Sequence, residues 1–345
     1  MTAGPLNFDP IATLLDLAGA DTTSGQEDRG LEPLVAHLRG LGAAVEFQKV
    51  EPGRTNVLAT WGRPDVLFTT HLDTVPPYIA PSLEGGLLRG RGACDAKGQI
   101  VAQLAAITRL LGAGESRLAF LGVVGEETDA LGAARASAFA PRLAETKLLV
   151  NGEPTDLKLA TGQRGYLHVR LRARGVAAHS GMPERGRSAI LLLLDWVEAL
   201  RKRLIPVDRD LGPEVWNLGT IAGGRAANIV PDEALADILV RSLPGTDFLA
   251  ALAGTAPGDC WFELLLSEEA ARYPRLDGYE YATMPFGSDL PTLARYAPGA
   301  AVALVGPGSI AVAHTEDEHI AIDDLRKGAD LLVRLASSEL SKQSK

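Results

Sequence analysis

The sequence predicts an α/β protein of two domains, one of them inserted into the other. The chain has 345 residues, which exceeds one average domain. Up to Val150, short β-branched runs alternate with helical patterns, as in an open α/β sheet. From Tyr166 the order becomes β-α-β-β-α-β, which is typical of a ferredoxin-like domain. We therefore expect a catalytic domain at residues 1–165 and 279–345, and an inserted α+β domain at residues 166–278.

The elements of the expected catalytic domain follow from hydrophobic periodicity and from Gly and Pro turns. Apolar residues at helical spacing predict helices at residues 10–18 and 26–41, the second ending at Gly40 and Gly42. An Ala-rich helix is expected at residues 99–111, and a closing helix at residues 322–340. Strands are expected at residues 44–50, 56–61, 65–70, 117–124, 147–150 and 301–305, with a hairpin at residues 82–88.

The expected insert begins with residues 166–173, which alternate as a half-exposed strand, followed by a strong helix at residues 188–204. Its remaining elements are strands at residues 215–221, 234–240 and 260–266 and a short helix at residues 248–253. The sequence contains no internal repeat and no low-complexity segment. The insert is therefore expected to be a folded domain of its own.

Composition excludes several classes of protein. The 46% hydrophobic and 22% charged content is ordinary for a globular chain, and no apolar run approaches the ~20 residues of a membrane span. A formal charge of -9 argues against general affinity for nucleic acid or anionic membranes. Cys94 and Cys260 are isolated and cannot form a disulfide framework. The N-terminus lacks the features of a signal peptide, so a cytoplasmic location is expected.

A buried strand at residues 65–70 is followed directly by His71 and Asp73. Residues two apart on an extended chain share a face, so both side chains can point into one site. An imidazole backed by a carboxylate suits metal ligation, in which the acid holds the ring in one tautomer. Because such a pair also occurs as an ordinary surface contact, it leaves both interpretations open by itself.

Acidic or imidazole residues recur in the loops between the expected elements. Carboxylate and imidazole ligands without thiolates suit Zn²⁺ or its neighbours in a catalytic site. Each position also has an ordinary interpretation, as a turn residue or a helix start. Their recurrence after strands favours a shared site. Besides His71 and Asp73, these residues are Asp95, Glu126, Glu127, Glu153 and His314.

Taken in chain order, these residues lie in motifs that resemble those of the M20 metallopeptidase family. The motifs are His71-Leu72-Asp73-Thr74-Val75-Pro76, Gly90-Arg91-Gly92 through Asp95-Ala96-Lys97-Gly98, Gly125-Glu126-Glu127, Gly152-Glu153-Pro154, and Ala313-His314-Thr315 through Asp317-Glu318. The resemblance covers nearly the whole chain. It implies a zinc-exopeptidase-like α/β/α catalytic domain with an inserted ferredoxin-like domain that acts as a dimerisation and lid domain.

The resemblance implies two Zn²⁺ ions, for which Co²⁺ can substitute. It makes His71 and Glu153 ligands of one ion, Glu127 and His314 ligands of the other, and Asp95 the bridge between them. Two cations a few Å apart lower the pKa of a bridging water and hold the scissile carbonyl. The ligand set is thus expected to support hydrolysis.

The same resemblance assigns two further catalytic roles. Glu126 becomes the general base, and Asp73 becomes the partner that orients His71. The adjacent pair Glu126 and Glu127 then provides one carboxylate for the proton and one for the metal. The resemblance also implies a cis peptide bond between Asp95 and Ala96.

The insert carries matches of its own at His179, Asn228 and Arg241. In the family this domain forms a homodimer, and the matching His steadies the oxyanion in the partner's site. The Asn and Arg positions contact the substrate or its carboxylate. From the residues alone, His179 is a polar loop residue among small neighbours, easily exposed.

The family is broad, and pocket contacts decide the substrate. Glu153, where other members carry Asp, is associated with acylases and carboxypeptidases of the family. Residues 305–308 and 287–289 most resemble the acetylornithine and acetylcitrulline deacetylase branch. The expected substrate is therefore a small N-acylated amino acid in arginine or lysine biosynthesis, with Arg241 on its α-carboxylate.

Three alternatives remain open. A lysine or ornithine hydrolase that acts on an amino-group carrier protein is close in length and motif. A carboxypeptidase or dipeptidase of the same family differs only in its pocket. A metal-free binding protein on this fold is disfavoured, because loss of catalysis should have removed a ligand or Glu126, and none is missing.

Overall fold

The computed structural model describes residues 8–342, which form two compact units. The first unit contains the described residues up to Thr161, then Tyr273–Ala282, then those from Ser288 onward. The second unit contains Gly162–Arg272 and Thr283–Gly287. The expected boundaries at 166 and 278 differ from these because two-residue strands leave no periodic signal. Within the second unit, β9 (Gly162–Gln163) pairs with β16 (Ala271–Arg272).

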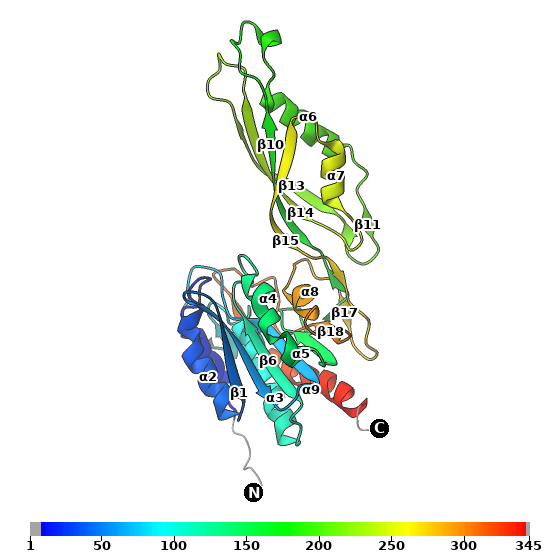
Figure 1. Ribbon diagram of the computed structural model, residues 1–345. Coiled ribbons are helices and arrows are strands. Elements are labelled where there is room, and N and C mark those ends of the chain that lie inside the picture. Colours follow the sequence, from blue (N-terminus) through cyan, green and yellow to red (C-terminus); the bar gives the residue numbers. More distant parts are fainter. Residues whose placement is uncertain (1–7, 343–345) are drawn as a thin grey trace. The chain divides into compact units, whose positions relative to one another are not determined.

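A six-stranded mixed sheet forms the centre of the first unit, with the order β1-β2-β6-β3-β7-β18 (Figure 1). Strands β6, β3, β7 and β18 are mutually parallel, whereas β1 and β2 form an antiparallel margin. Every residue of β3, β6 and β7 is buried, as expected for parallel strands covered on both faces. The bounds are β1 Ala44–Glu51, β2 Arg54–Trp61, β3 Val66–His71, β6 Leu118–Val123, β7 Leu148–Asn151 and β18 Ala301–Leu304.

Helix α3 is buried over most of its surface and packs against α1 and α9. Its buried polar residues include Gln99 and Gln103, whose side chains donate hydrogen bonds to the backbone carbonyls of Cys94 and Thr69. The side chains of these helices and of the sheet form one continuous core. The helices of this unit are α1 Pro10–Ala18, α2 Leu31–Gly40, α3 Lys97–Gly112, α4 Leu131–Arg135, α5 Ala140–Leu143, α8 Leu290–Ala294 and α9 Ile322–Lys342, with 3₁₀ turns η1 Glu27–Gly30 and η2 Ala136–Phe139.

The helix expected at residues 26–41 is divided in the structure into η1 and α2. Glu27 in the 3₁₀ turn is buried and accepts hydrogen bonds from the Gly25 backbone N–H and the Arg54 side chain. The 3₁₀ turn is thus held by tertiary contacts of Glu27, which hydrophobic periodicity does not predict. Small sheets complete the unit: β4 Ser82–Glu84, β5 Leu87–Arg89 and β19 His319–Ala321 form one, and β8 Leu159–Ala160 pairs with β17 Tyr281–Ala282.

The second unit has the β-α-β-β-α-β order expected from the sequence. Its antiparallel sheet has the strand order β13-β14-β10-β15, with α6 and α7 packed on the sheet over a separate core (Figure 1). The elements are β10 Tyr166–Arg174, α6 Ala189–Arg201, β13 Val215–Gly223, β14 Glu233–Arg241, α7 Phe248–Thr255 and β15 Cys260–Glu268, with η3 Pro183–Arg185 and the pair β11 Val207–Asp208 and β12 Gly212–Pro213.

The alternation within this sheet explains the separate core. Along β10, Leu167, Val169, Leu171 and Ala173 are buried, and the residues between them are not. One face of the strand therefore meets the helices, as the half-exposed pattern predicted. No helix within residues 8–342 has the length and apolarity that crossing a membrane requires.

Candidate metal centre

The carboxyl ends of parallel strands bring the candidate residues to one edge of the first unit's sheet. His71 is the last residue of β3, and Glu126 and Glu127 follow β6 in the adjacent position. Glu153 follows β7, the neighbour of β3 on the other side. Open α/β sheets bind ligands at this edge, because loops from neighbouring strands diverge there. The spacing seen in the sequence therefore corresponds to a cluster in space.

Asp95 lies at the centre of this cluster. Its Oδ1 atom is 2.9 Å from Nε2 of His71, and its Oδ2 atom is 3.5 Å from Nε2 of His314. The same His314 nitrogen lies 2.9 Å from Oε1 of Glu127. One ligand atom from each of His71, Asp95 and Glu127 lies within 4.8 Å of the others. The two oxygens of one carboxylate thus face two different imidazoles.

Glu153 and Glu126 complete the cluster. Glu153 is buried, and its Oε1 atom accepts a hydrogen bond of 3.4 Å from the Asn151 side chain. Burial raises the pKa of Glu153 well above its ordinary value, and the charges of Asp95 and Glu127 add to this rise. Burial likewise raises the pKa of Glu126, and the Glu153 charge adds to it. This part of the site therefore holds more negative charge than it can stabilise alone.

Hydrogen bonds to Asp95 and Glu127 raise the pKa of His314 to about 10. Burial opposes the charge of Asp95, but hydrogen bonds from His314 and His71 hold its pKa below the ordinary value. Both pKa shifts arise because a positive charge next to these carboxylates is electrostatically favourable. Divalent cations satisfy such a demand and displace protons when they bind. The donors are nitrogen and oxygen only, and Asp95 offers one oxygen to each side, so the residues fit a pair of divalent cations.

Asp73 supports the site through its carboxylate. Its Oδ1 atom accepts the backbone N–H groups of Gly125 and Glu126 at 3.0 and 3.1 Å, and its Oδ2 atom accepts that of Glu127 at 3.2 Å. The Ser24 hydroxyl donates a further bond of 2.7 Å to Oδ2. His71 Nδ1 lies 3.0 Å from the Asp73 backbone oxygen and 3.5 Å from Oδ1. Asp73 therefore contacts both the imidazole and the turn that carries the two glutamates.

A second buried carboxylate, that of Glu318, holds the loop of Asp95. Its Oε1 atom accepts the backbone N–H groups of Gly92, Cys94 and Asp95 at 3.0 to 3.1 Å. Its Oε2 atom lies 2.5 Å from Nη1 of Arg91, and both side chains are buried. The sequence motifs contain Arg91 and Glu318, but nothing local assigns them this role. The peptide bond between Asp95 and Ala96 is cis, so that prediction is confirmed.

In the second unit, His179 and Asn228 lie together, whereas Arg241 lies elsewhere. The Ser180 N–H donates to the Asn228 carbonyl at 3.0 Å, and His179 bridges to Ile229. The Gly181 N–H donates to Nδ1 of His179 at 3.0 Å, so the neutral ring carries its proton on Nε2. Arg241 ends the nine-residue strand β14 and packs over the Tyr166 ring at 4.9 Å. A strand of that length spans roughly 26 Å, which separates Arg241 from the loop of Asn228.

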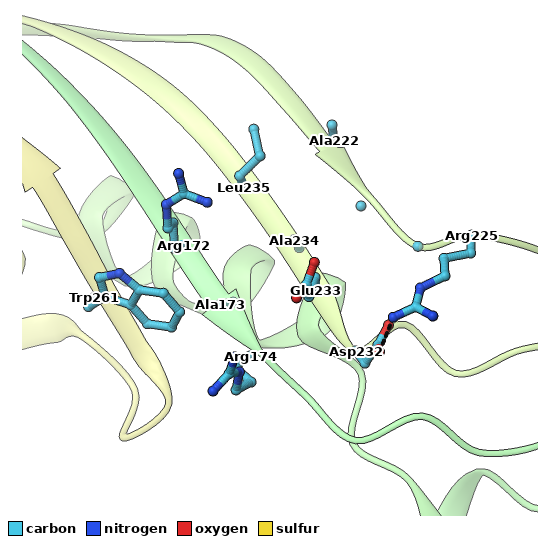
Figure 2. A pocket seen from close by; sticks show the side chains of 12 residues that line it. Arg172, Ala173, Arg174, Ala222, Arg225, Asp232, Glu233, Ala234, Leu235 and Trp261 are labelled. Carbon is cyan, nitrogen blue, oxygen red and sulfur yellow. Dashed lines mark hydrogen bonds and ion pairs between the residues drawn. The ribbon is translucent and has the colours of Figure 1, made fainter. Parts of the chain in front are cut away.

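A hollow of about 410 Å³ also occurs in the second unit, beside β10, β14 and Trp261 (Figure 2). Its charges are largely paired: Arg225 meets Asp232, as Figure 2 shows, and Arg172 lies 2.7 Å from Glu263. None of the residues that line it is a histidine or a cysteine. This hollow therefore lacks the donor set found at the edge of the first unit's sheet.

Comparison with known proteins gives consistent matches. Residues 161–254 match the family model described as a peptidase dimerisation domain, M20_dimer. The chain is 33% identical to a peptidase M20 domain-containing protein of Schizosaccharomyces pombe, over 97% of this chain and 86% of that protein. It is 35% identical to a protein of Aspergillus clavatus named "probable carboxypeptidase", over 85% of this chain and 80% of the other.

Two solved structures share the fold. Aminopeptidase PepT from Bacillus cereus superposes with a TM-score of 0.77 at 22% identity, covering 94% of this chain and 96% of the other. A dinuclear metal-binding peptidase of Bacillus subtilis superposes with a TM-score of 0.66 at 16% identity, covering 94% and 97%. At these identities the likeness shows the fold alone.

Proposed function

The chain belongs to the M20 peptidase family, and from that premise we propose that it is a metal-dependent carboxypeptidase. The expected reaction is hydrolysis of a linear amide bond whose leaving amino acid carries a free α-carboxylate. The observation that carries this proposal is the position of Asp95, whose two oxygens face His71 and His314 separately. A carboxylate placed in this way suits a bridge between two cations.

The proposed cations are two Zn²⁺ ions, for which Co²⁺ can substitute. His71 and Glu153 would hold one ion, Glu127 and His314 would hold the other, and Asp95 would contribute to both. When bound, such a pair supplies Lewis-acid polarisation of the scissile carbonyl and makes water more acidic. The nitrogen and oxygen donors of this set suit Zn²⁺, although they do not exclude its neighbours.

Glu126 is the proposed general base. It is adjacent to the ligand Glu127, is half-buried, and makes none of the close contacts that join Asp95, Glu127 and the two imidazoles. Its carboxylate would take a proton from the attacking water as the new C–O bond forms. The same group would then deliver that proton to the amide nitrogen as the C–N bond breaks. Asp73 would hold Glu126 in place through the backbone of its turn.

The names of the relatives favour a peptide as the substrate. The protein of Aspergillus clavatus carries a carboxypeptidase name, whereas neither relative described above carries a deacetylase name. Deacetylation of N-acetylornithine or N-acetylcitrulline, and hydrolysis on an amino-group carrier protein, therefore stay predictions from the sequence. Arg241 is the proposed partner of the substrate carboxylate, because its guanidinium can bind a carboxylate through two parallel hydrogen bonds.

We also propose a homodimer formed through the second unit. Strand β13 lies at the edge of its sheet, where its backbone can pair with another strand. Large apolar side chains are exposed on α6 and β13: Leu191 is 62% exposed, and Leu194, Val215 and Ile221 are 44 to 47% exposed. A self-complementary contact between two copies would cover them.

In such a dimer, His179 and Asn228 of one protomer would serve the site of its partner. The separation of Asn228 and Arg241 within the second unit supports this arrangement, because residues at opposite ends of the same strand would serve different sites. The Nε2 proton of His179 would donate to the oxyanion, since Nδ1 is engaged by the Gly181 N–H.

A substrate panel tests the proposed reaction. Protein purified without chelator would be assayed against N-blocked dipeptides, the same dipeptides as C-terminal amides, unblocked tripeptides and N-acetyl amino acids. We expect Zn²⁺- or Co²⁺-dependent release of the C-terminal residue, and its loss upon amidation. Faster cleavage of N-acetylornithine than of any peptide would favour the deacetylase instead. If the protein hydrolyses none of these amides in the presence of Zn²⁺ or of Co²⁺, the proposal is wrong.

A further inference from the structure

The turn formed by residues 125–130 carries the proposed general base, and it is tightly closed. The carbonyl of Gly125 accepts the N–H groups of Thr128, Asp129 and Ala130 at 3.2, 3.0 and 2.7 Å. Gly125 itself has φ of 80°, in the left-handed region that favours glycine. These bonds tie Asp129 to Gly125, the neighbour of Glu126, so a contact that holds Asp129 also constrains Glu126.

Arg54, the first residue of β2, holds Asp129. Its Nη1 atom donates to Oδ2 of Asp129 at 2.8 Å, and its Nη2 atom donates to Oδ1 at 2.8 Å. Two parallel bonds between a guanidinium and a carboxylate fix orientation as well as distance. The Arg54 side chain is only 7% exposed, whereas that of Asp129 is 44% exposed, so the guanidinium is the buried member of the pair.

The Arg54 guanidinium also packs against the backbone of the turn. A Cβ atom built at Gly125 would lie 1.8 Å from Nη2 of Arg54 and 2.6 Å from Oδ1 of Asp129. No side chain could therefore occupy position 125 while the pair is intact. The contact leaves little room for the turn to move toward β2.

The Arg54 contacts connect to those of Asp73 through residues 24–27. Nε of Arg54 lies 3.3 Å from Oε1 of Glu27, and Oε2 of Glu27 accepts the Gly25 N–H at 2.9 Å. The preceding residue, Ser24, donates its hydroxyl hydrogen bond to Asp73. The two groups that hold the glutamate turn thus share one supporting segment.

We propose that Arg54 is a positioning residue. Its two hydrogen bonds to Asp129 hold the turn of residues 125–130 and thereby fix the position of the Glu126 carboxylate. This role rests on the proposed function, because it presumes that Glu126 moves the proton. It makes Arg54 act on the turnover rate of metal-saturated protein rather than on substrate binding; because the same turn carries the proposed ligand Glu127, we expect metal affinity to fall as well. A displacement of about 1 Å at a reacting group can lower a rate a hundredfold.

The first test compares Arg54→Met and Asp129→Asn with Arg117→Met. Arg117 pairs with Asp65 at 2.9 Å just before β6, at the end of that strand remote from Glu126, and is a matched control. With metal kept at saturating concentration, we expect kcat to fall about tenfold to a hundredfold in the first two variants and KM to change less than about threefold. Arg117→Met should stay within about twofold of the parent. Hydrogen exchange of a peptide covering residues 125–131 should accelerate in Arg54→Met and Asp129→Asn only.

Asp129→Asn tests the same contact in case Arg54→Met does not fold. The Asp129 side chain is 44% exposed, and its amide replacement can still accept the Leu131 N–H. It loses one of the two contacts to Arg54, and the buried guanidinium keeps its contacts with Glu27 and Glu51. Normal kcat and normal exchange in this variant would overturn the proposal.

The decisive measurement repeats Arg54→Met in a Glu126→Gln background. If Arg54 acts through Glu126, adding Arg54→Met should lower the kcat that remains in Glu126→Gln by less than about twofold. The effects of residues that act through one another do not add. If Arg54→Met lowers the kcat of Glu126→Gln by tenfold or more, Arg54 does not act through Glu126. If the parent enzyme hydrolyses no amide, the proposed function fails, whereas the exchange measurement still decides whether Arg54 fixes the turn.

Discussion

The carboxylate of Asp73 accepts the backbone N–H of Glu126 at 3.1 Å, so the residue that contacts the proposed metal ligand His71 also holds the proposed base. The same oxygen accepts the Gly125 N–H, and the other oxygen accepts that of Glu127. Burial opposes the charge of Asp73, but these bonds and that of His71 hold its pKa below the ordinary value. Any change at Asp73 should therefore disturb metal binding and proton transfer together, whereas a change at Glu126 should separate them.

Replacement of Glu126 by Gln should lower turnover severely and leave metal content intact. Gln keeps the shape of the side chain but cannot take a proton, and the loss of a general base typically lowers the rate by ~10²–10⁴. Metal analysis and kcat measured on the same preparation check this. Loss of metal, or a rate near that of the parent, would show that Glu126 is a ligand or a bystander.

Replacement of Arg91 by Met should destabilise the fold strongly. Arg91 and Glu318 are both buried, and removing one partner of a buried pair typically costs ~3–5 kcal/mol because the other charge stays unpaired. Arg109→Met is the control: its partner Asp330 is exposed, and such surface pairs contribute ~0–1 kcal/mol. The free energy of unfolding in urea, measured on metal-free protein, compares the two. Equal losses would contradict the assigned role of Glu318.

Stability should depend on Glu27 between about pH 4.5 and pH 7. Burial raises the pKa of Glu27 from 4.5 to about 7, so in this window the folded state keeps a proton that the unfolded state has lost. The free energy of unfolding should therefore fall as pH rises through the window, by roughly 3 kcal/mol at one pKa unit per 1.36 kcal/mol. Glu27→Gln should remove this slope. Unfolding of metal-free parent and variant at several pH values is the measurement, and parallel curves would refute the shift.

Exchange of subunits should reveal whether the site is completed by a second copy. His179→Ala should lower kcat by about a hundredfold or more, because a lost oxyanion donor typically costs 10²–10³. Mixing that variant with Glu126→Gln should restore part of the activity, since one site of the mixed dimer keeps both groups. Absence of recovery, in a mixture shown to exchange subunits, would place His179 outside the partner's site.

The cluster of candidate ligands could be predicted from the sequence because each member lies in a local pattern. His71 ends a strand of buried residues, and Glu126 and Glu127 follow another, so strand order alone brings them to one edge. Arg91 and Glu318 are 227 positions apart, and no local pattern relates them. Arg54 and Asp129 are 75 apart. Such pairs become visible only when the sheet is assembled.

Short helices and strands could not be predicted from the sequence for a related reason. Helix α8 has five residues and β9 has two, which is less than the span over which a period can be recognised. Their positions are fixed by contacts rather than by propensity. The compact second unit extends to β9 and β16, so its limits differ by a few residues from the boundaries that periodicity predicts.

The pairing of β9 with β16 has a consequence for how the chain folds. In the sheet of the first unit, Leu148 of β7 pairs with Ala301 of β18, and the whole insert lies between them in sequence. The entropy lost in closing a loop rises with its length. A folded insert whose ends are already joined by β9 and β16 acts as a short connection. The second unit should thus fold first, and β18 should then join the edge of the sheet at the rate expected for a much shorter loop.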